Sequence, residues 1–182
     1  MNICLCFGYF PSSLEETIRL NTKSGLQNAA DVLQKKIIDG LCSLNINLTI
    51  INAPFVGYFI LKYKSPWVKK SYFHQQINGT DIDVQSYGFN TLPYFTHKQR
   101  KLTCKRKLRH WLQQHKEKKI VIVYSVNMAF ITACTELKEE FDFKLVVIVP
   151  DLPQYMNASN KWYSKLHEKI GKVLSRNRTE VY

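Results

Sequence analysis

Apolar and polar positions along the chain predict strands and helices in alternation. The apolar runs Ile120–Tyr124 and Lys144–Val149 contain no polar alternation, which is typical of strands covered on both faces of a parallel sheet. Between the two runs, apolar residues recur at helical spacing: Met128, Ile131, Ala133, Cys134, Leu137 and Phe141. The stretch 119–156 is therefore predicted to form a strand, a helix and a second strand parallel to the first.

The N-terminal quarter of the chain predicts another strand, helix and strand. A strand over residues 2–7 is followed by a polar loop through Pro11, Ser12 and Ser13, a helix from about Ser24, and a strand over Asn47–Asn52. The apolar stripe of this helix is expected at Leu26, Ala29, Ala30, Leu33, Ile37, Ile38 and Leu41. Because crossover connections are right-handed, the two strands should be parallel.

The middle of the chain gives a weaker pattern. Residues 53–95 are rich in aromatic residues and prolines, and they predict a long connection with one short strand near Ile82–Ser86. A basic helix over about Thr96–Lys116 and a last helix over Lys161–Arg176 complete the elements. The fold class is therefore α/β, a Rossmann-like open parallel sheet flanked by helices. One domain over residues 1–182 and the strand order 3-2-1-4-5 are expected.

This strand order reverses between the first and the fourth strand, and ligands of open α/β sheets bind at the carboxyl ends of the strands at such a point. Gly8 and the loop after it should therefore lie beside Tyr124, Ser125 and Asn127. Ser125 and Asn127 can either hydrogen-bond a polyol without charge or cap the helix that starts near Met128.

Ser24, Gly25 and Asn28 surround the expected start of the first long helix. The unpaired N–H groups of a helix start attract phosphate or carboxylate, and a glycine lets a ligand approach the backbone. Alternatively, Ser24 is a helix cap and Gly25 a helix-start residue. The chain has neither a GxGxxG sequence close behind its first strand nor a Walker A sequence, so no dinucleotide or other cofactor is expected.

Asp151 lies between Pro150 and Pro153, directly after a predicted buried strand. The prolines restrict the backbone and would hold the carboxylate at the edge of the sheet. There it could accept a hydrogen bond from a sugar hydroxyl or act as a base, or it could cap the following turn.

The chain carries a formal net charge of +12, which favours anionic partners such as nucleic acid, anionic lipid or phosphorylated ligands. Ten of its Lys and Arg residues lie between Lys98 and Lys119, with one acidic residue. This segment is either a solvated helix face or a surface for anionic membrane or nucleic acid. The five cysteines have no metal-ligand spacing, so we expect reduced, mostly buried thiols, no metal site and a cytoplasmic location.

Three blocks of sequence together resemble a known family: SGLQNAADVLQKKIIDGL (24–41), INAPFVGYF (51–59), and IVYSVNMAF with VIVPDLPQYM (122–130 and 148–156). They are similar to the N-terminal domain of family 4-like bacterial glycosyltransferases of surface-polysaccharide (capsule) synthesis. The resemblance covers nearly the whole chain and keeps the order of the blocks. It implies one half of a GT-B fold, in which two Rossmann-like domains face each other across a cleft.

The resemblance also implies roles for particular residues. Ser24 and Gly25 match the loop that approaches the donor phosphates, with Asn28 after it, while Tyr124, Ser125 and Asp151 match strand ends that line the acceptor side of the cleft. Two residues depart from the family's pattern, because Asn127 stands where a histidine is common and Ile60 where a proline is usual. No catalytic residue is assigned.

The resemblance implies a retaining transfer that needs no metal, from a nucleotide-sugar to a saccharide or lipid-linked acceptor. The family's donor-binding domain has no counterpart within these 182 residues, so we expect an acceptor-side domain or split subunit that works with a separate donor-domain polypeptide. A location at the inner face of the plasma membrane would suit such an enzyme. The alternatives are a basic, non-enzymatic module that binds nucleic acid or anionic membrane, and an inactive truncated remnant.

Overall fold

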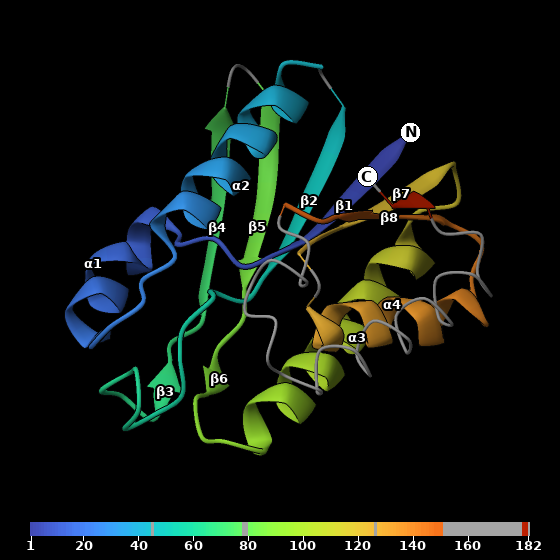
Figure 1. Cartoon of the computed structure of the whole chain (residues 1–182). Helices are drawn as coiled ribbons and strands as arrows, with labels where there is room; N and C mark the ends of the chain where they lie inside the picture. Colours follow the sequence, from blue (N-terminus) through green and yellow to red (C-terminus); the bar gives the residue numbers. More distant parts are fainter. Residues whose placement is uncertain (45, 78–79, 126, 151–179, 182) are drawn as a thin grey trace.

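The computed structural model describes residues 1–44, 46–77, 80–125, 127–150 and 180–181. Its main feature is a seven-stranded sheet with the strand order β4-β5-β2-β1-β7-β8-β9 (Figure 1). The strands are β1 (Asn2–Phe7), β2 (Asn47–Asn52), β4 (Ser71–Ile77), β5 (Thr80–Ser86), β7 (Lys119–Tyr124), β8 (Lys144–Ile148) and β9 (Glu180–Val181). All neighbours are parallel except β4 and β5, so the chain is an α/β protein with a mostly parallel, Rossmann-like sheet.

The predicted strand order 3-2-1-4-5 is confirmed, since it corresponds to β5-β2-β1-β7-β8. β1 pairs in parallel with β2 on one edge and with β7 on the other, and β7 pairs in parallel with β8. The sheet order therefore reverses between β1 and β7, as the sequence indicates.

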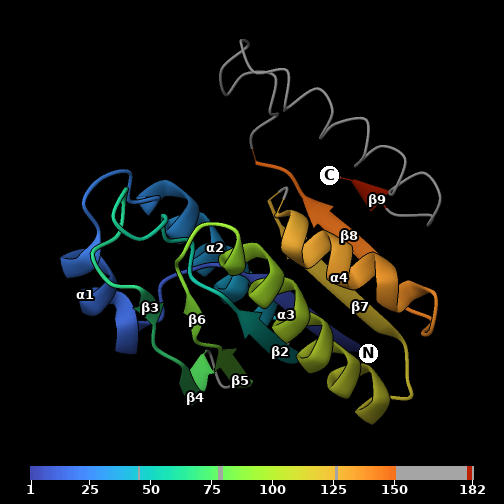
Figure 2. The same ribbon diagram turned by 90° about the horizontal axis from the view of Figure 1, so that it is seen from below.

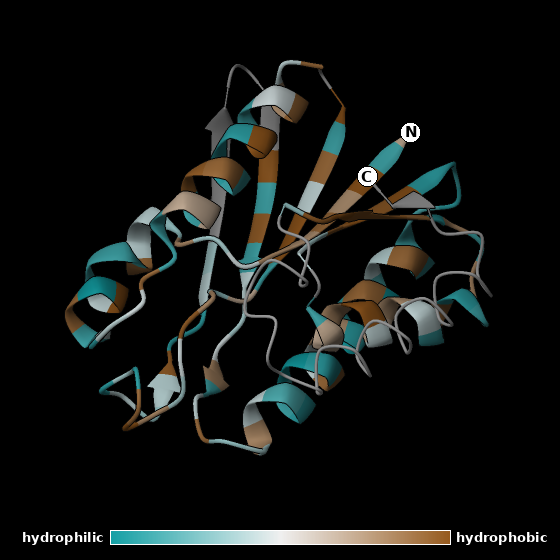
Figure 3. Ribbon diagram, viewed as in Figure 1, coloured by the Kyte–Doolittle hydropathy of each residue, from teal (hydrophilic) through white to brown (hydrophobic). Residues whose placement is uncertain are grey.

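Helices cover both faces of this sheet (Figures 1 and 2). α2 (Asn28–Cys42) lies on one face, while α3 (Phe95–Gln114) and α4 (Met128–Lys138) lie on the other. In β1, Ile3, Leu5 and Phe7 pack with the α2 side. Cys4 and Cys6, which alternate with them, pack with α3 and α4. Figure 3 shows the apolar residues that run along these central strands and along the helix sides that face them.

Three elements differ from the sequence-based expectation. The loop expected after the first strand contains a helix, α1 (Ser12–Asn21), which buries only Leu14 and Ile18 and so carries too short an apolar stripe to stand out. The connection between β2 and α3 holds more than one strand: β4 forms an antiparallel hairpin with β5, and β3 (Trp67–Val68) pairs with β6 (Phe89–Asn90). The predicted helix 161–176 lies outside the described residues.

The buried face of α2 also differs from the predicted stripe. Leu33 is exposed, whereas Asp31 and Gln34 are buried. The Oε1 atom of Gln34 accepts a hydrogen bond from the Gly8 N–H at 2.7 Å, and the Oδ1 atom of Asp31 accepts one from the Phe10 N–H at 2.6 Å. Two polar side chains are buried here because they satisfy backbone N–H groups of the chain that leaves β1.

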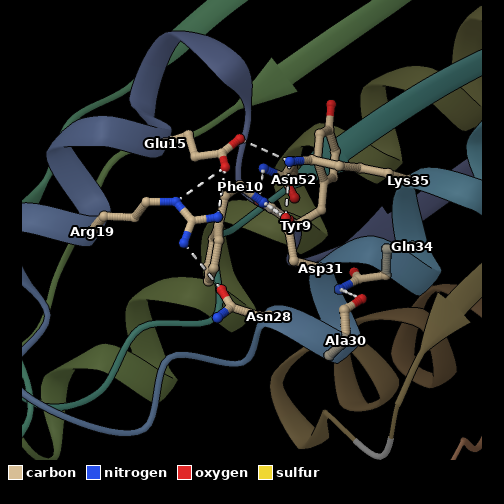
Figure 4. Close-up of polar contacts among 10 residues, drawn as sticks. All are labelled: Tyr9, Phe10, Glu15, Arg19, Asn28, Ala30, Asp31, Gln34, Lys35 and Asn52. Atoms are coloured by element: carbon tan, nitrogen blue, oxygen red, sulfur yellow. Dashed lines mark hydrogen bonds and ion pairs between the residues drawn. The ribbon is translucent and has the colours of Figure 1, made fainter.

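Asp31 belongs to a polar network that joins α1 to α2 (Figure 4). The Lys35 ammonium contacts the carboxylates of Asp31 and Glu15, each at 2.9 Å. Glu15 also pairs with Arg19 at 2.8 Å. Arg19 in turn donates to the Oδ1 atom of Asn28 at 3.3 Å. This network attaches α1 to the first turns of α2.

Charged residues of α3 face α4 and form ion pairs with it. Lys101 and Lys105 both contact the Glu136 carboxylate, and Arg109 contacts Glu140. Three cations of the basic segment are therefore engaged within the chain, in support of the packing of α3 on α4.

The cysteines behave as core residues. Cys4, Cys6, Cys42, Cys104 and Cys134 are all free and buried, and burial raises the pKa of the Cys4 thiol. The described residues contain no group of His, Cys, Asp and Glu side chains that could hold a metal ion. Among these same residues, no helix combines the length and the apolar character that crossing a membrane requires.

We expect Asp31→Ala to lower the free energy of unfolding by about 2 kcal/mol, because it leaves the buried Phe10 N–H without an acceptor. The measurement is urea denaturation at neutral pH. Asp39→Ala is the control on the same helix, since Asp39 forms only an exposed pair with Lys36 at 3.8 Å and its loss should cost less than about 0.5 kcal/mol. Equal losses in the two variants would contradict the role given to Asp31.

The ion pairs of Glu136 predict a dependence of stability on pH. Lys101 and Lys105 hold the pKa of Glu136 below its usual value of 4.5. A lowered folded-state pKa contributes stability above the unfolded pKa, and this stability disappears as the pH falls through the folded pKa. We therefore expect Glu136→Gln to cost about 0.5–1 kcal/mol at pH 7 and almost nothing near pH 3.

Urea denaturation at the two pH values tests this expectation. Glu139→Gln is the control, because Glu139 is exposed at the end of α4 and forms no ion pair within the described residues. A loss for Glu136→Gln that stays constant from pH 7 to pH 3 would show that the ion pairs do not cause it.

Candidate functional site

A cleft lies beside the carboxyl ends of the parallel strands, where the strand order reverses. It consists of two adjoining hollows with cavity volumes of ≈ 380 and ≈ 310 Å³. Five residues line both hollows: Val56, Gly57, Lys62, Arg100 and Asn127. One hollow adds Tyr58, Thr96, His97 and Ala129, and the other adds Gly25, Gln27, Phe55 and Ser125. These thirteen residues are called the cleft below.

Three helices begin at the cleft. Gln27 is the N-cap residue of α2, Thr96 and His97 belong to the first turn of α3, and Asn127 is the N-cap residue of α4. Each helix start carries a partial positive charge of about +0.5 from its unpaired N–H groups. The first turns of α3 and α4 contain no acidic residue to offset this charge. The backbone alone therefore makes the cleft favourable for anions.

Arg100 is the cation held most firmly in the cleft. Its Nη2 atom donates to the Pro54 carbonyl at 2.8 Å, and its guanidinium lies 4.1 Å from the centre of the Phe89 ring. Its Nε atom is buried and forms no hydrogen bond within the described part of the chain. Burial lowers the pKa of Arg100 to about 10, so the side chain stays charged at neutral pH.

Lys62 supplies a second cation from the loop between β2 and β3. The side chain is exposed, and its ammonium forms no hydrogen bond or ion pair among the described residues. Its Nζ atom lies 3.8 Å from the position that a Cβ would take at Gly25. Gly25 has a φ of +71°, a left-handed conformation that favours glycine. Lys62 and the Gly25 backbone therefore share one side of the cleft.

Ser125 and Asn127 line the cleft from the turn that follows β7. Asn127 also caps α4, because its Oδ1 atom accepts a hydrogen bond from the Ala129 N–H at 3.1 Å. The capping role that the sequence left open is thus present. The amide NH₂ of Asn127 forms no hydrogen bond within the described residues and remains a donor for a ligand. Ser125 does not cap the helix; it adopts a φ of 64° in the turn, and its N–H donates to the Ile148 carbonyl.

Gly8 and Tyr124 lie beneath the cleft, and neither lines its two hollows. A Cβ at Gly8 would clash with the Phe55 ring, and the centre of the Tyr124 ring lies 6.4 Å from the centre of the Phe55 ring. Tyr124 is only 2% exposed. Phe55 therefore covers both residues and forms the floor of the cleft above them.

The remaining predicted residues lie apart from the cleft surface or outside the described chain. Ser24 is exposed three residues before the Gln27 N-cap, so it does not cap α2, which begins at Asn28. The Asn28 side chain accepts a hydrogen bond from Arg19. Asp151 lies outside the described residues.

The backbone at Ile60 has a conformation that proline cannot adopt. It has a φ of 68°, and its N–H donates to the Tyr63 carbonyl at 2.9 Å. A proline could supply neither, because its ring holds φ near −65° and it has no N–H. The loop that carries Lys62 therefore has a shape that a proline at position 60 would forbid.

The sequence-based reasoning missed Arg100 and Lys62. Arg100 precedes Cys104 and Leu108, both fully buried, at helical spacing, so it is a cation on the apolar side of a basic helix. A basic residue in line with apolar residues is a signal that the sequence contains. It is hard to recognise here because the segment holds many other basic residues. Lys62 carries no comparable signal, since it lies in an irregular loop.

The arrangement can bind an anion together with a hydroxyl-bearing group. The cleft contains two cations and the polar, uncharged side chains of Gln27, Thr96, Ser125 and Asn127, and none of its described lining residues is a carboxylate. Comparisons of the chain with protein-family models, with curated proteins and with solved structures found no match.

Proposed function

We propose that this chain forms the acceptor-side half of a GT-B glycosyltransferase, which contributes to sugar transfer from a nucleotide-sugar to a saccharide or lipid-linked acceptor. The observation that carries the proposal is the cleft at the reversal of strand order, with Gly25, Ser125 and Asn127 together on its surface. These three residues come from two of the sequence blocks that resemble the family. A sugar offers hydroxyl groups to Ser125 and Asn127, and a nucleotide-sugar also offers phosphates to the cations.

An exposed apolar surface beside the cleft supports a facing half. The loops 58–61 and 92–95 form this surface. A hydrogen bond from the Phe59 N–H to the Thr91 carbonyl joins the two parts of the chain. The most exposed members of the surface are Tyr94 at 95% and Leu61 at 69%, and the others are Tyr58, Ile60, Leu92 and Phe95. Large exposed apolar surfaces mark interaction sites. A donor-binding domain docked here would close the cleft from its open side.

This proposal divides the chemistry between two halves. Loss of the nucleoside diphosphate requires preorganised positive charge near the departing phosphates, which is usually the largest catalytic contribution. In this proposal, the donors and cations that line the two hollows form one wall of the cleft, and a donor-binding half supplies the other. We therefore expect binding by the 182-residue chain, and sugar transfer only when a donor-binding half is present.

The basic segment gives less support to a nucleic-acid or membrane function. Lys101, Lys105 and Arg109 are engaged with acidic residues of α4, and Arg100 faces the cleft. Charge reversal at Lys105 or Arg109 would break the pairing of α3 with α4, so such variants cannot serve as a specific test of nucleic-acid binding. Arg106, which is exposed and forms no ion pair within the described residues, is the better position for that purpose.

We expect nucleotide-sugars to shift the backbone amide resonances of Gly25, Gly57, Ser125 and Asn127 in a titration followed by ¹⁵N NMR. Asn127→Asp should weaken this binding about tenfold, because it places a negative charge in the cleft. Aspartate is as good an N-cap as asparagine, so α4 should keep its stability. Asn127→Ser is the matched control, which keeps a cap without adding charge.

The titration uses a panel of uridine-, guanosine- and thymidine-diphosphate sugars, each compared with its nucleoside diphosphate. A sugar-dependent gain in affinity supports the proposal. Two results would contradict it: cleft amides that respond to no sugar-containing ligand, and sugar transfer from a nucleotide-sugar by the 182-residue chain alone.

A further inference from the structure

Two cations from different parts of the chain meet at the cleft. Arg100 comes from the second turn of α3 and Lys62 from the loop after β2, and both line both hollows. Elsewhere in the chain, carboxylates pair with several Lys and Arg side chains. In the cleft, none of the described lining residues is a carboxylate. The charge of these two side chains is therefore left for something outside the described residues.

The surroundings of Arg100 hold its guanidinium in one orientation. The central carbon of the guanidinium lies over the Phe89 ring, and Nη2 donates a hydrogen bond to the Pro54 carbonyl. The residue's own backbone carbonyl accepts a hydrogen bond from the Tyr87 hydroxyl at 3.3 Å, which ties this part of α3 to the same aromatic pair. A stacked and anchored guanidinium loses little conformational entropy when it binds an anion.

The described partners of Arg100 satisfy neither all its hydrogen-bond donors nor its positive charge. Nε is buried without a hydrogen bond, and the one side-chain hydrogen bond found in the described chain goes to a neutral carbonyl. A partly buried charge without an anionic partner is costly, and a buried donor without an acceptor adds to that cost. Such a site gains free energy when an anion with several oxygen acceptors enters it.

We propose that Arg100 and Lys62 form a subsite for a phosphoryl group, with Arg100 as the fixed ligand and Lys62 as the mobile one. A guanidinium matches the geometry of phosphate oxygens, and an ammonium on a flexible stem can follow them as a point charge. The Gly25 backbone, close to the Lys62 ammonium, leaves room for the ligand. The starts of α3 and α4, whose first turns contain no acidic residue, add their partial positive charges to the same volume.

This subsite adds a phosphate-binding role to the proposed function. It rests on the proposed function only in the choice of the molecule that carries the phosphate. Two sources supply the same chemistry, namely the diphosphate of a nucleotide-sugar and the diphosphate of a lipid-linked acceptor. The binding experiment separates them by using one soluble representative of each.

The probe is inorganic pyrophosphate, measured by isothermal titration calorimetry with the 182-residue chain at about 0.1 M salt. We expect Lys62→Gln to weaken pyrophosphate binding about tenfold, and Arg100→Met to weaken it at least as much. Lys62 is exposed, so the Lys62→Gln variant should fold normally. It therefore still tests the proposal if the Arg100→Met variant fails to fold. Arg106→Gln is the matched control, because it removes the same charge from the exposed side of α3.

Repeating the titrations with uridine diphosphate glucose and with farnesyl diphosphate identifies the source. The ligand whose affinity falls in Lys62→Gln is the one that places its phosphate in the subsite. The proposal is overturned if pyrophosphate does not bind the unaltered chain, or if Arg106→Gln weakens binding as much as Lys62→Gln does.

The subsite and the glycosyltransferase function can fail separately. If pyrophosphate binding depends on Lys62 but the cleft does not respond to sugar-containing ligands, the subsite is supported. The glycosyltransferase proposal is then contradicted. If binding depends on the sugar but is unchanged in the Lys62→Gln and Arg100→Met variants, only the subsite proposal is contradicted.

Discussion

β1 is paired on both edges and covered on both faces, and the position of the cleft follows from this burial. Every residue of the strand is at most 4% exposed. Parallel neighbours on either side bring the ends of β2 and β7 to the same edge of the sheet. The helices that follow or precede these strands must then start at that edge, and their positive ends face the cleft.

The chain leaving β1 is secured by polar groups as well as by the apolar packing of Tyr9 and Phe10. Gln34 and Asp31, both on α2, satisfy the N–H groups of Gly8 and Phe10. Because α2 begins at the cleft, the same helix that anchors this loop also places the Gln27 end beside Gly25. Stability and the shape of the candidate site therefore depend on one helix.

α3 divides its positive charge between two purposes. The side toward α4 carries the cations that pair with Glu136 and Glu140, and the buried side carries Arg100 at the mouth of the apolar seam. The high net charge of the chain thus says little about function until each cation is located. A cation paired with a carboxylate contributes to packing, while a cation that faces a hollow without carboxylates attracts a ligand.

The sequence by itself determined the α/β class, the strand order from β5 to β8 and the edge of the sheet at which Ser125 and Asn127 lie. These features depend on runs of apolar residues and on the handedness of crossovers, which are local or topological rules. It did not reveal α1 or β4, whose short or polar segments become regular only through contacts with neighbours.

Only the tertiary structure decided which polar groups are buried and which cations face the cleft. Asp31 and Gln34 look like surface residues of an amphipathic helix, and Arg100 looks like one basic residue among many. Their roles come from partners distant in sequence: Phe10 for Asp31, Gly8 for Gln34, Phe89 and Pro54 for Arg100. Periodicity records which side of an element is apolar, but the partner of a polar group depends on how elements far apart in the chain pack together.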